Sequence, residues 1–302
     1  MASTYGSMPQ WLSNPPDDIP GQRQAVLGLL GQRLSVSQLE GQLSTADQVP
    51  VLMVEQFGPG SHHDEEILSW HDPSLQVPIV LPDMALECPL GNLEAILISE
   101  SPRMVYLKDF VTEVERKHII KISEPILEQS TVFDAETKGP STDLTFRRSD
   151  SAAPARDEIV KCIEQRARLA QPWSPGMGLE ILSVQRYQKN GFFSHHWDSF
   201  LNSPGPDRKS TFNIFLDGNC TGGGTHFPEL PFPDDPDLCN ILDCDSKLNG
   251  TVFKPITGNA IFWENVRSDG SRYEETIHAG LPVEEGTKIG MNIWTWGFPD
   301  TD

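Results

Sequence analysis

The pattern of hydrophobic and polar positions changes near residue 95. Before that point the chain carries scattered prolines and one weakly amphipathic segment, Gln22–Leu43, in which leucines recur near helical spacing but glycines interrupt the pattern. After it, short apolar runs alternate with turn signals. We therefore expect a partly irregular N-terminal extension, residues 1–94, and one folded domain, residues 95–302.

Two helices are expected early in the domain. Thr112 followed by Glu115 forms a capping-box pattern, which predicts a helix that begins there and stops near Pro125. A second helix is predicted from about Asp157 to Ala170, because apolar residues recur along one side of it. Its cysteine, Cys162, is expected to be a small core residue.

Strands dominate the rest of the domain. The predicted strands are Ala95–Ile98, Met104–Leu107, Leu179–Tyr187, Thr211–Leu216, Thr251–Lys254, Ala260–Trp263, Glu275–His278 and Lys288–Trp296. Short strands separated by turns are typical of a barrel or a two-sheet jelly roll. The fold class we expect is therefore mainly β with flanking helices. The long acidic segment Pro228–Asn249 interrupts the strands, and we expect it to be a lid or a binding loop.

Charge excludes some partners. The formal net charge is −20 and no basic block is present, so nucleic acid and anionic membrane surfaces are not expected as partners. No apolar run approaches the ~20 residues of a membrane helix, and the N-terminus does not have the pattern of a signal peptide.

Cysteine usage bears on the compartment. The five cysteines are odd in number and widely spaced, which favours a reducing compartment, and we expect a cytoplasmic location. Cys239 and Cys244 lie close enough in sequence to bridge, but only in an oxidising setting.

The chemistry centres on the stretch that ends in His196-Trp197-Asp198. Residues two apart in a strand point to the same face, so His196 and Asp198 would present an imidazole and a carboxylate side by side. With one more histidine they would form the two-histidine, one-carboxylate facial triad of non-haem Fe(II) oxygenases. Candidates for that ligand are His118, His226 and His278.

Other histidines are expected to play no part in metal binding. His195 should face away from His196 in the strand, and His226 should likewise point away from the pocket. A second His-x-Asp pair, His62 with Asp64, lies in a polar stretch that we interpret as a surface loop.

Lys288 follows His278 by ten residues and offers a positive charge within the fold. A buried lysine needs an anionic partner, and a dicarboxylate cosubstrate that chelates the metal would supply one. Tyr187 could add a hydrogen bond from its phenol. The run Gly222-Gly223-Gly224-Thr225 allows a close approach of the backbone, with the Thr225 hydroxyl directed inward.

This ordered set of motifs resembles the prolyl 4-hydroxylase family of Fe(II)/2-oxoglutarate dioxygenases over about residues 95–296. The matching stretches are Tyr187, His196-Trp197-Asp198, Gly222-Gly223-Gly224-Thr225-His226-Phe227-Pro228, His278-Ala279-Gly280, Gly286-Thr287-Lys288 and Trp294, together with Ser101–Phe110, Ser130-Thr131-Val132 and Arg147-Arg148-Ser149 upstream. The resemblance implies a double-stranded β-helix core and a dioxygenase that hydroxylates an unactivated C–H bond.

The resemblance also implies roles for individual residues. His196, Asp198 and His278 would bind Fe(II), and Lys288 would hold the distal carboxylate of 2-oxoglutarate. The expected pocket and substrate contacts are Tyr187, Thr225 and Trp294 for 2-oxoglutarate, and Arg208 and Trp296 for the substrate. O2 would be the second cosubstrate, with ascorbate an additional expected cofactor.

The substrate stays open between two classes. A prolyl residue in a peptide or protein is the first expectation. Trp296 stands where plant and algal family members that hydroxylate peptides usually carry a histidine, which keeps open a small molecule or free amino acid as the substrate. A third alternative, from a different functional class, is a non-catalytic interaction module on the same fold.

Overall fold

The computed structural model describes residues 67–69, 78–80, 88, 93–134, 139–174, 176–200 and 206–297. The predicted helix Gln22–Leu43 and the His62–Asp64 pair lie outside the described residues.

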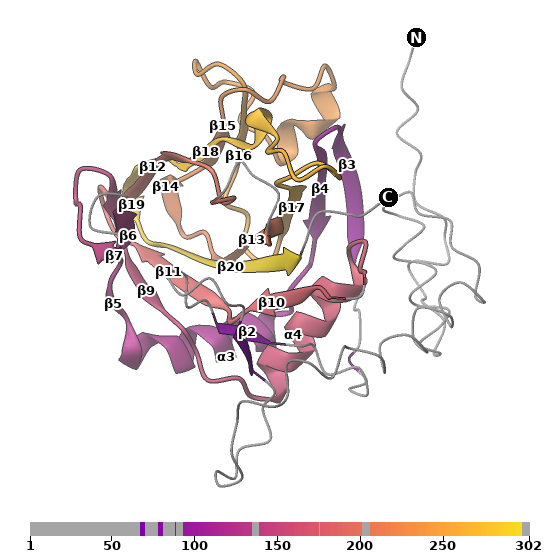
Figure 1. The fold of residues 1–302 in the computed structure, drawn as a ribbon. Helices are drawn as coiled ribbons and strands as arrows, with labels where there is room; N and C mark the ends of the chain where they lie inside the picture. The colour runs from indigo at the N-terminus through magenta and orange to yellow at the C-terminus, as the bar shows by residue number, and fades with distance from the viewer. Residues whose placement is uncertain are drawn as a thin grey trace, which may run out of the picture.

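Two antiparallel sheets form the body of the protein (Figure 1). The main path of the large sheet runs β1 (Ile67–Ser69), β2 (Pro78–Val80), β10 (Gly178–Glu180), β20 (Lys288–Gly297), β13 (Asp207–Asp217), β17 (Ala260–Glu264), β4 (Arg103–Lys108) and β3 (Glu94–Glu100), and it also includes β5 (Glu128–Gln129), β9 (Asp150–Ala152) and β11 (Ser183–Tyr187). The small sheet runs β16 (Thr251–Phe253), β15 (Thr225–Phe227), β18 (His278–Gly280), β12 (Phe192–His196) and β8 (Arg147–Arg148). This confirms the predicted jelly-roll core.

Two strand pairs stand apart from these sheets. They are β6 (Val132–Asp134) with β7 (Gly139–Ser141), and β14 (Cys220–Gly222) with β19 (Val283–Gly286). The sheet order also shows that β1 and β2, which come from the expected N-terminal extension, continue the large sheet beyond β10.

Both predicted helices are present on the outer side of the large sheet (Figure 1). The helix α3 (Glu113–Ser123) begins with the predicted capping box, in which the Thr112 side chain accepts from the amide of Glu115 and the Glu115 side chain accepts from the amide of Thr112. The helix α4 (Glu158–Leu169) is capped by the Asp157 side chain. The described residues also contain three short 3-10 helices, η4 (Glu124–Ile126), η5 (Pro236–Asn240) and η6 (Glu274–Thr276).

Strand alternation divides the core into two clusters. On β13, Phe212 and Ile214 face the helices and pack with buried residues of α4 such as Ile163. Phe215, from the opposite face of the same strand, packs with Phe227 of the small sheet. The polar residues that share the inward face of β13 therefore point into the space between the two sheets.

Two strand predictions need correction. The predicted strand Leu179–Tyr187 is divided into β10 and β11, which pair with different parts of β20. The predicted strand Glu275–His278 is wrong, because residues 274–276 form η6 and His278 begins a strand rather than ending one.

The interpretation of the cysteines as reduced thiols is also wrong. Cys162 of α4 forms a disulfide with Cys88, across a sequence separation of 74 residues, and Cys239 forms a second disulfide with Cys244. Cys220 is a free cysteine. The Cys88–Cys162 disulfide could not be predicted, because sequence spacing does not reveal which distant cysteines come together in the fold. The Cys88–Cys162 disulfide fastens the segment that precedes β3 to α4.

We expect loss of the long-range disulfide to destabilise the fold. A Cys88→Ala/Cys162→Ala double variant should lose about 2–4 kcal/mol of unfolding free energy, because the cross-link closes a long loop and restricts the unfolded chain. The Cys239→Ala/Cys244→Ala variant should lose less. Urea unfolding measures both, with Cys220→Ser as the matched control. Equal stability of the Cys88/Cys162 variant and the unmodified protein would contradict the prediction.

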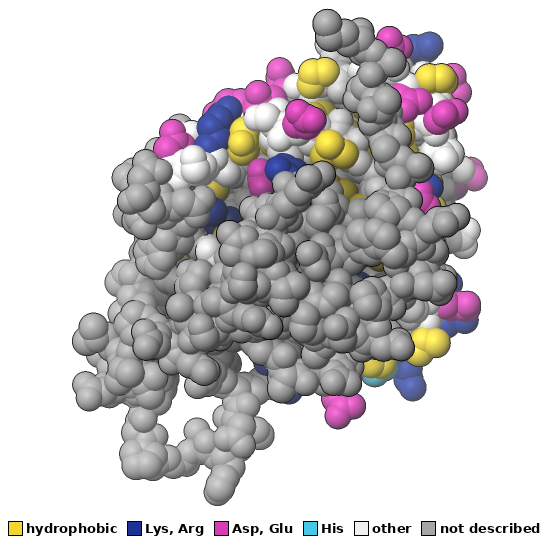
Figure 2. Space-filling model, turned by 90° about the vertical axis from the view of Figure 1, so that its right-hand side faces the viewer, with side chains coloured by type: hydrophobic (Ala, Val, Ile, Leu, Met, Phe, Trp, Pro, Cys, Tyr) yellow, Lys and Arg dark blue, Asp and Glu magenta, His cyan; other side chains and the backbone are white. Residues whose placement is uncertain are grey.

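The surface mixes charges of both signs. On the face shown in Figure 2, acidic and basic side chains of the described residues are interspersed with single hydrophobic ones, as on a solvated surface. None of the helices in the described part of the chain has the length and apolar character that a membrane crossing requires.

Candidate metal centre

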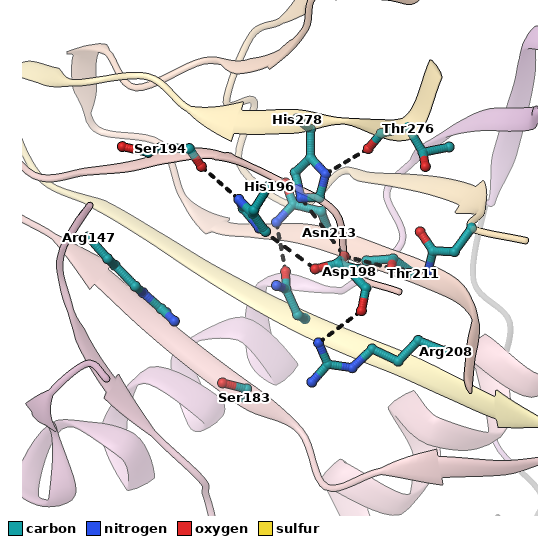
Figure 3. Close-up of polar contacts among 12 residues, drawn as sticks. Arg147, Ser183, Ser194, His196, Asp198, Arg208, Thr211, Asn213, Thr276 and His278 are labelled. Carbon is teal, nitrogen blue, oxygen red and sulfur yellow. Dashed lines mark hydrogen bonds and ion pairs between the residues drawn. The ribbon is translucent and has the colours of Figure 1, made fainter. Parts of the chain in front are cut away.

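Three potential metal ligands converge between the two sheets. His196 ends β12, His278 begins the neighbouring strand β18, and the two are directly paired in register. Asp198 follows β12, and a ligand atom from each of the three lies within 4.8 Å of the others. His196 Nε2 lies 3.7 Å from Asp198 Oδ1, and His278 Nε2 lies 3.8 Å from Asp198 Oδ2 (Figure 3).

Backbone carbonyls orient both imidazoles. His196 Nδ1 lies 2.7 Å from the carbonyl oxygen of Ser194, and His278 Nδ1 lies 3.0 Å from that of Thr276 (Figure 3). A carbonyl oxygen can only accept, so each Nδ1 carries the proton and donates it. Each Nε2 is then left with a lone pair directed toward Asp198, which is the arrangement of metal-binding histidines.

The protonation states also suit a cation. Burial and then the neighbouring His278 lower the pKa of His196 to about 3, so this imidazole is neutral near pH 7. Burial opposes ionisation of Asp198, but electrostatic interactions with His278, His196 and Arg208, together with the Thr211 hydrogen bond, hold its pKa below the usual value. A neutral imidazole and an ionised carboxylate are the forms that bind a metal.

Lys288, at the start of β20, supplies a buried positive charge. It is 4% exposed, and its Nζ donates to the carbonyl oxygen of Gly223 at 2.7 Å. Among the described residues no carboxylate pairs with it, and burial lowers its pKa to about 8. A buried ammonium with only a carbonyl partner suits an anionic ligand.

The residues expected to contact 2-oxoglutarate besides Lys288 are Tyr187, Thr225 and Trp294. Tyr187 is paired with Lys288 across β11 and β20, and Lys288 Nζ lies 5.6 Å from the centre of the Tyr187 ring. The Thr225 hydroxyl donates to Asn213 Oδ1 at 3.1 Å. The indole N–H of Trp294 is buried and has no hydrogen-bond partner in the described part of the chain. The unpaired Lys288 charge fits one carboxylate of a bound dicarboxylate.

Arg208 and Trp296 both make hydrogen bonds to the Glu180 carboxylate, and Arg208 also contacts the Asp198 carbonyl oxygen. The Arg208 guanidinium makes a two-point ion pair with Glu180, at 2.5 Å from Nε and 2.9 Å from Nη2, and stacks 3.8 Å from the centre of the Trp294 ring. The Trp296 indole N–H also donates to Glu180. Arg208 is therefore neither a free cation nor a solvated loop charge, since Glu180 neutralises it.

Three further histidines lie in the described part of the chain, and none of them is among the converging ligands. His195 Nε2 lies 3.1 Å from His226 Nδ1, and His226 Nε2 donates to the carbonyl oxygen of Asn249 at 2.7 Å. His118 pairs with Asp157 at 2.5 Å, which links α3 to the start of α4. The expectation that His195 and His226 serve other roles agrees with this geometry, and the candidate His118 lies on α3 with a partner of its own.

Several residues of the site were missed by sequence reasoning. Glu180 carries no motif that distinguishes it from a surface glutamate. Thr211 and Asn213, by contrast, are polar residues two apart in the predicted strand Thr211–Leu216, whose other residues are apolar. Their spacing places them on one face, and a polar face on a buried strand is a signal that could have marked them as site residues.

Comparison with known proteins agrees with this geometry. A family model described as the 2OG-Fe(II) oxygenase superfamily matches residues 182–296. Prolyl 4-hydroxylase 1 of Arabidopsis thaliana is 30% identical over 215 residues, which cover 68% of this chain and 72% of the relative. Probable prolyl 4-hydroxylase 3 of the same plant is 30% identical over 211 residues, covering 68% and 72%.

A solved structure is also similar. It is the viral collagen prolyl hydroxylase of Paramecium bursaria Chlorella virus-1 in complex with 2-oxoglutarate, at 21% identity and a TM-score of 0.47, covering 64% of this chain and 96% of that one. The identity and coverage of the plant relatives, with the match of the family model, establish the family. The chain belongs to the prolyl 4-hydroxylase-like family of Fe(II)- and 2-oxoglutarate-dependent dioxygenases.

Proposed function

We propose that His196, Asp198 and His278 hold the Fe(II) on which this dioxygenase family depends. The observation that carries the proposal is the convergence of two Nε2 lone pairs and one carboxylate, each already oriented by its other polar atom. Three ligands on one side leave positions open for a cosubstrate.

The proposed 2-oxoglutarate pocket is centred on Lys288. Its ammonium would hold the distal carboxylate, with Tyr187 and Thr225 as hydrogen-bond partners and Trp294 as the wall. The buried positive charge of Lys288 supports this assignment, because it lacks the anionic partner that a carboxylate provides. When bound, Fe(II) and 2-oxoglutarate together with O2 supply oxidative decarboxylation to succinate and CO2, coupled to insertion of one oxygen atom into a C–H bond.

The residues of this chain would position and shield that chemistry. The two sheets exclude water from the triad, since Asp198 and His278 are 4% and 6% exposed. Asp198 occupies the position that a halide would need, so hydroxylation is favoured over halogenation. Arg208 Nη1 donates to the backbone carbonyl oxygen of Asp198 at 3.4 Å, and Arg208 and Trp296 stay our candidates for substrate contacts.

The proposed substrate is a prolyl residue in a peptide or protein. The names of the plant relatives support this choice. A small molecule or free amino acid is the second candidate, favoured by Trp296 in place of the histidine of peptide-hydroxylating members. A non-catalytic interaction module is the third, and the complete ligand set disfavours it.

Turnover assays separate these candidates. We expect the purified protein with Fe(II), 2-oxoglutarate and O2 to form succinate faster when a proline-rich peptide is added, and the peptide to gain the mass of one oxygen atom. A gain confined to free amino acids would favour the second candidate. Neither succinate formation nor Fe(II) binding would favour the interaction module. Omitting ascorbate tests whether that reductant is needed.

The proposed dioxygenase domain, residues 95–302, takes in β1, β2 and Cys88 from the extension 1–94, since these are joined to the sheet and to α4. The cytoplasmic location stays a prediction. The two disulfides favour an oxidising compartment in its place, because disulfides are rare where thiols are kept reduced.

A further inference from the structure

A chain of three hydrogen bonds connects the Asp198 carboxylate to the interior of the large sheet. The Trp263 indole N–H donates to Asn265 Oδ1 at 2.7 Å, and Asn265 Nδ2 donates to Thr211 Oγ1 at 2.9 Å. Thr211 Oγ1 in turn lies 2.7 Å from Asp198 Oδ2 (Figure 3). Trp263, Asn265 and Thr211 are at most 1% exposed, so water does not compete for these bonds.

The direction of the chain is fixed by its first member. An indole N–H can only donate, so the side-chain oxygen of Asn265 must face Trp263 and its NH2 group must face Thr211. The Thr211 oxygen then accepts from Asn265, and its one proton is directed to Asp198. The geometry thus imposes a donor, rather than an acceptor, on Oδ2 of the carboxylate.

The strands that carry Thr211, Asn265 and Trp263 hold this hydrogen-bond chain in place. Thr211 is paired with Trp263 across β13 and β17. Asn265 lies just beyond β17, where its backbone N–H donates to the carbonyl oxygen of Lys209 at 2.8 Å and its own carbonyl accepts from the amide of Tyr273 at 2.9 Å. The side chain of Asn265 is therefore held between strands rather than on a mobile loop.

Trp263, the first member of this hydrogen-bond chain, also contacts His278, the second histidine of the triad. The Trp263 ring packs edge-on against His278, with centroids 4.9 Å apart and an interplanar angle of 67°, and also against Phe227 at 5.2 Å. One buried indole therefore supports His278 with its ring and Asp198 through its N–H. Neither Trp263 nor Asn265 is a metal ligand.

We propose that Thr211, Asn265 and Trp263 are positioning residues that fix the Asp198 carboxylate with Oδ2 engaged and Oδ1 left for the metal. This inference rests on the proposed role of Asp198 as a ligand. A carboxylate without the Thr211 donor could rotate, and its two oxygens would become equivalent toward a cation. Loss of partners that orient metal ligands typically lowers metal affinity by about 10–100-fold.

Metal binding by the full-length protein tests the proposal, with Co(II) alone as the probe. Thr211→Val keeps the branched shape and removes the hydroxyl. We expect it to weaken Co(II) binding in calorimetric titration by about 10–100-fold and to change the visible spectrum of the bound Co(II), which reports ligand geometry. Thr211→Ser, which restores a hydroxyl, should recover most of both. An unchanged affinity and spectrum in Thr211→Val would overturn the proposal.

Two further variants keep the test decisive. Thr251→Val is the matched control, because Thr251 is also fully buried but donates to backbone carbonyls at 3.2 Å; it should lose stability and keep Co(II) affinity. If Thr211→Val does not fold, Trp263→Phe decides, since it keeps an aromatic side chain and removes the N–H. Weaker Co(II) binding by Trp263→Phe supports the positioning proposal, and binding equal to that of the unmodified protein overturns it.

The outcome is separable from that of the proposed function. His196→Ala serves as the reference variant. If His196→Ala loses Co(II) while Thr211→Val and Trp263→Phe bind it normally, only the positioning chain is wrong. If His196→Ala itself binds Co(II) normally with an unchanged spectrum, the metal centre is wrong and the positioning proposal falls with it.

Discussion

His196→Ala is expected to abolish both Fe(II) binding and succinate formation. The substitution removes one of three protein ligands from a site that leaves the remaining positions to exchangeable molecules. Turnover should fall by more than about 10³-fold, the scale at which removal of an essential catalytic group is felt. Anaerobic titration with Fe(II) measures the binding, and coupled detection of succinate measures the turnover.

His195→Ala provides a matched control in the adjacent residue. Its imidazole is exposed and bonds to His226 rather than to Asp198. Fe(II) binding and succinate formation should therefore persist in His195→Ala. If the two variants behaved alike, the assignment of His196 as the ligand would fail. Because His196 packs 3.7 Å from the Phe193 ring centroid, circular dichroism should accompany the assay to show that the variant is folded.

Much of the fold could be predicted from local patterns. The capping box at Thr112 and the apolar runs of β4 and β17 are local signals, and short-range physics determines their structure. The prediction failed where tertiary contacts decide. Thr276 lies in a 3-10 turn that brings its carbonyl oxygen to His278, although the local sequence reads as a strand.

The candidate site divides in the same way. The spacing of His196 and Asp198 predicted that they lie side by side, although β12 ends at His196 and Asp198 lies just beyond it. His278 needed a resemblance to other proteins to be chosen among three histidines. The partners that orient these ligands could not be chosen at all, because Thr211 and Asn265 are 54 residues apart and meet only when β13 and β17 pair. Glu180 likewise could not be identified from the sequence, although its carboxylate forms the ion pair that neutralises Arg208.

Lys288→Met is expected to make the protein more stable and to weaken its binding of 2-oxoglutarate. Burial lowers the Lys288 pKa from 10.5 to about 8, so holding the charge inside the fold at pH 7 costs up to about 3 kcal/mol at 1.36 kcal/mol per pKa unit. A methionine of similar length removes that cost, and urea unfolding should show a gain of about 1–3 kcal/mol. The apparent dissociation constant of 2-oxoglutarate should rise by about 10²–10³-fold, as expected for loss of a buried ion-pair partner.

Lys254→Met is the control, because Lys254 Nζ also donates to a backbone carbonyl, that of Cys239, at 2.7 Å. It lies away from the triad, so 2-oxoglutarate binding should not change. Reduced stability together with unchanged 2-oxoglutarate binding in Lys288→Met would place the cosubstrate carboxylate elsewhere.

The pH dependence of the unmodified protein tests the same charge without a substitution. Below about pH 8 the Lys288 ammonium is charged and can bind a carboxylate. Above that pH, binding must first take up a proton, so the affinity for 2-oxoglutarate should fall by up to about tenfold per pH unit.

The unfolding free energy should instead rise with pH. The folded-state pKa lies below the ordinary value of 10.5, so the unfolded chain binds more protons between about pH 8 and 10.5 and the unfolding free energy rises with pH in that window. Lys288→Met should remove both slopes, and a variant that kept them would show that another group carries the titration.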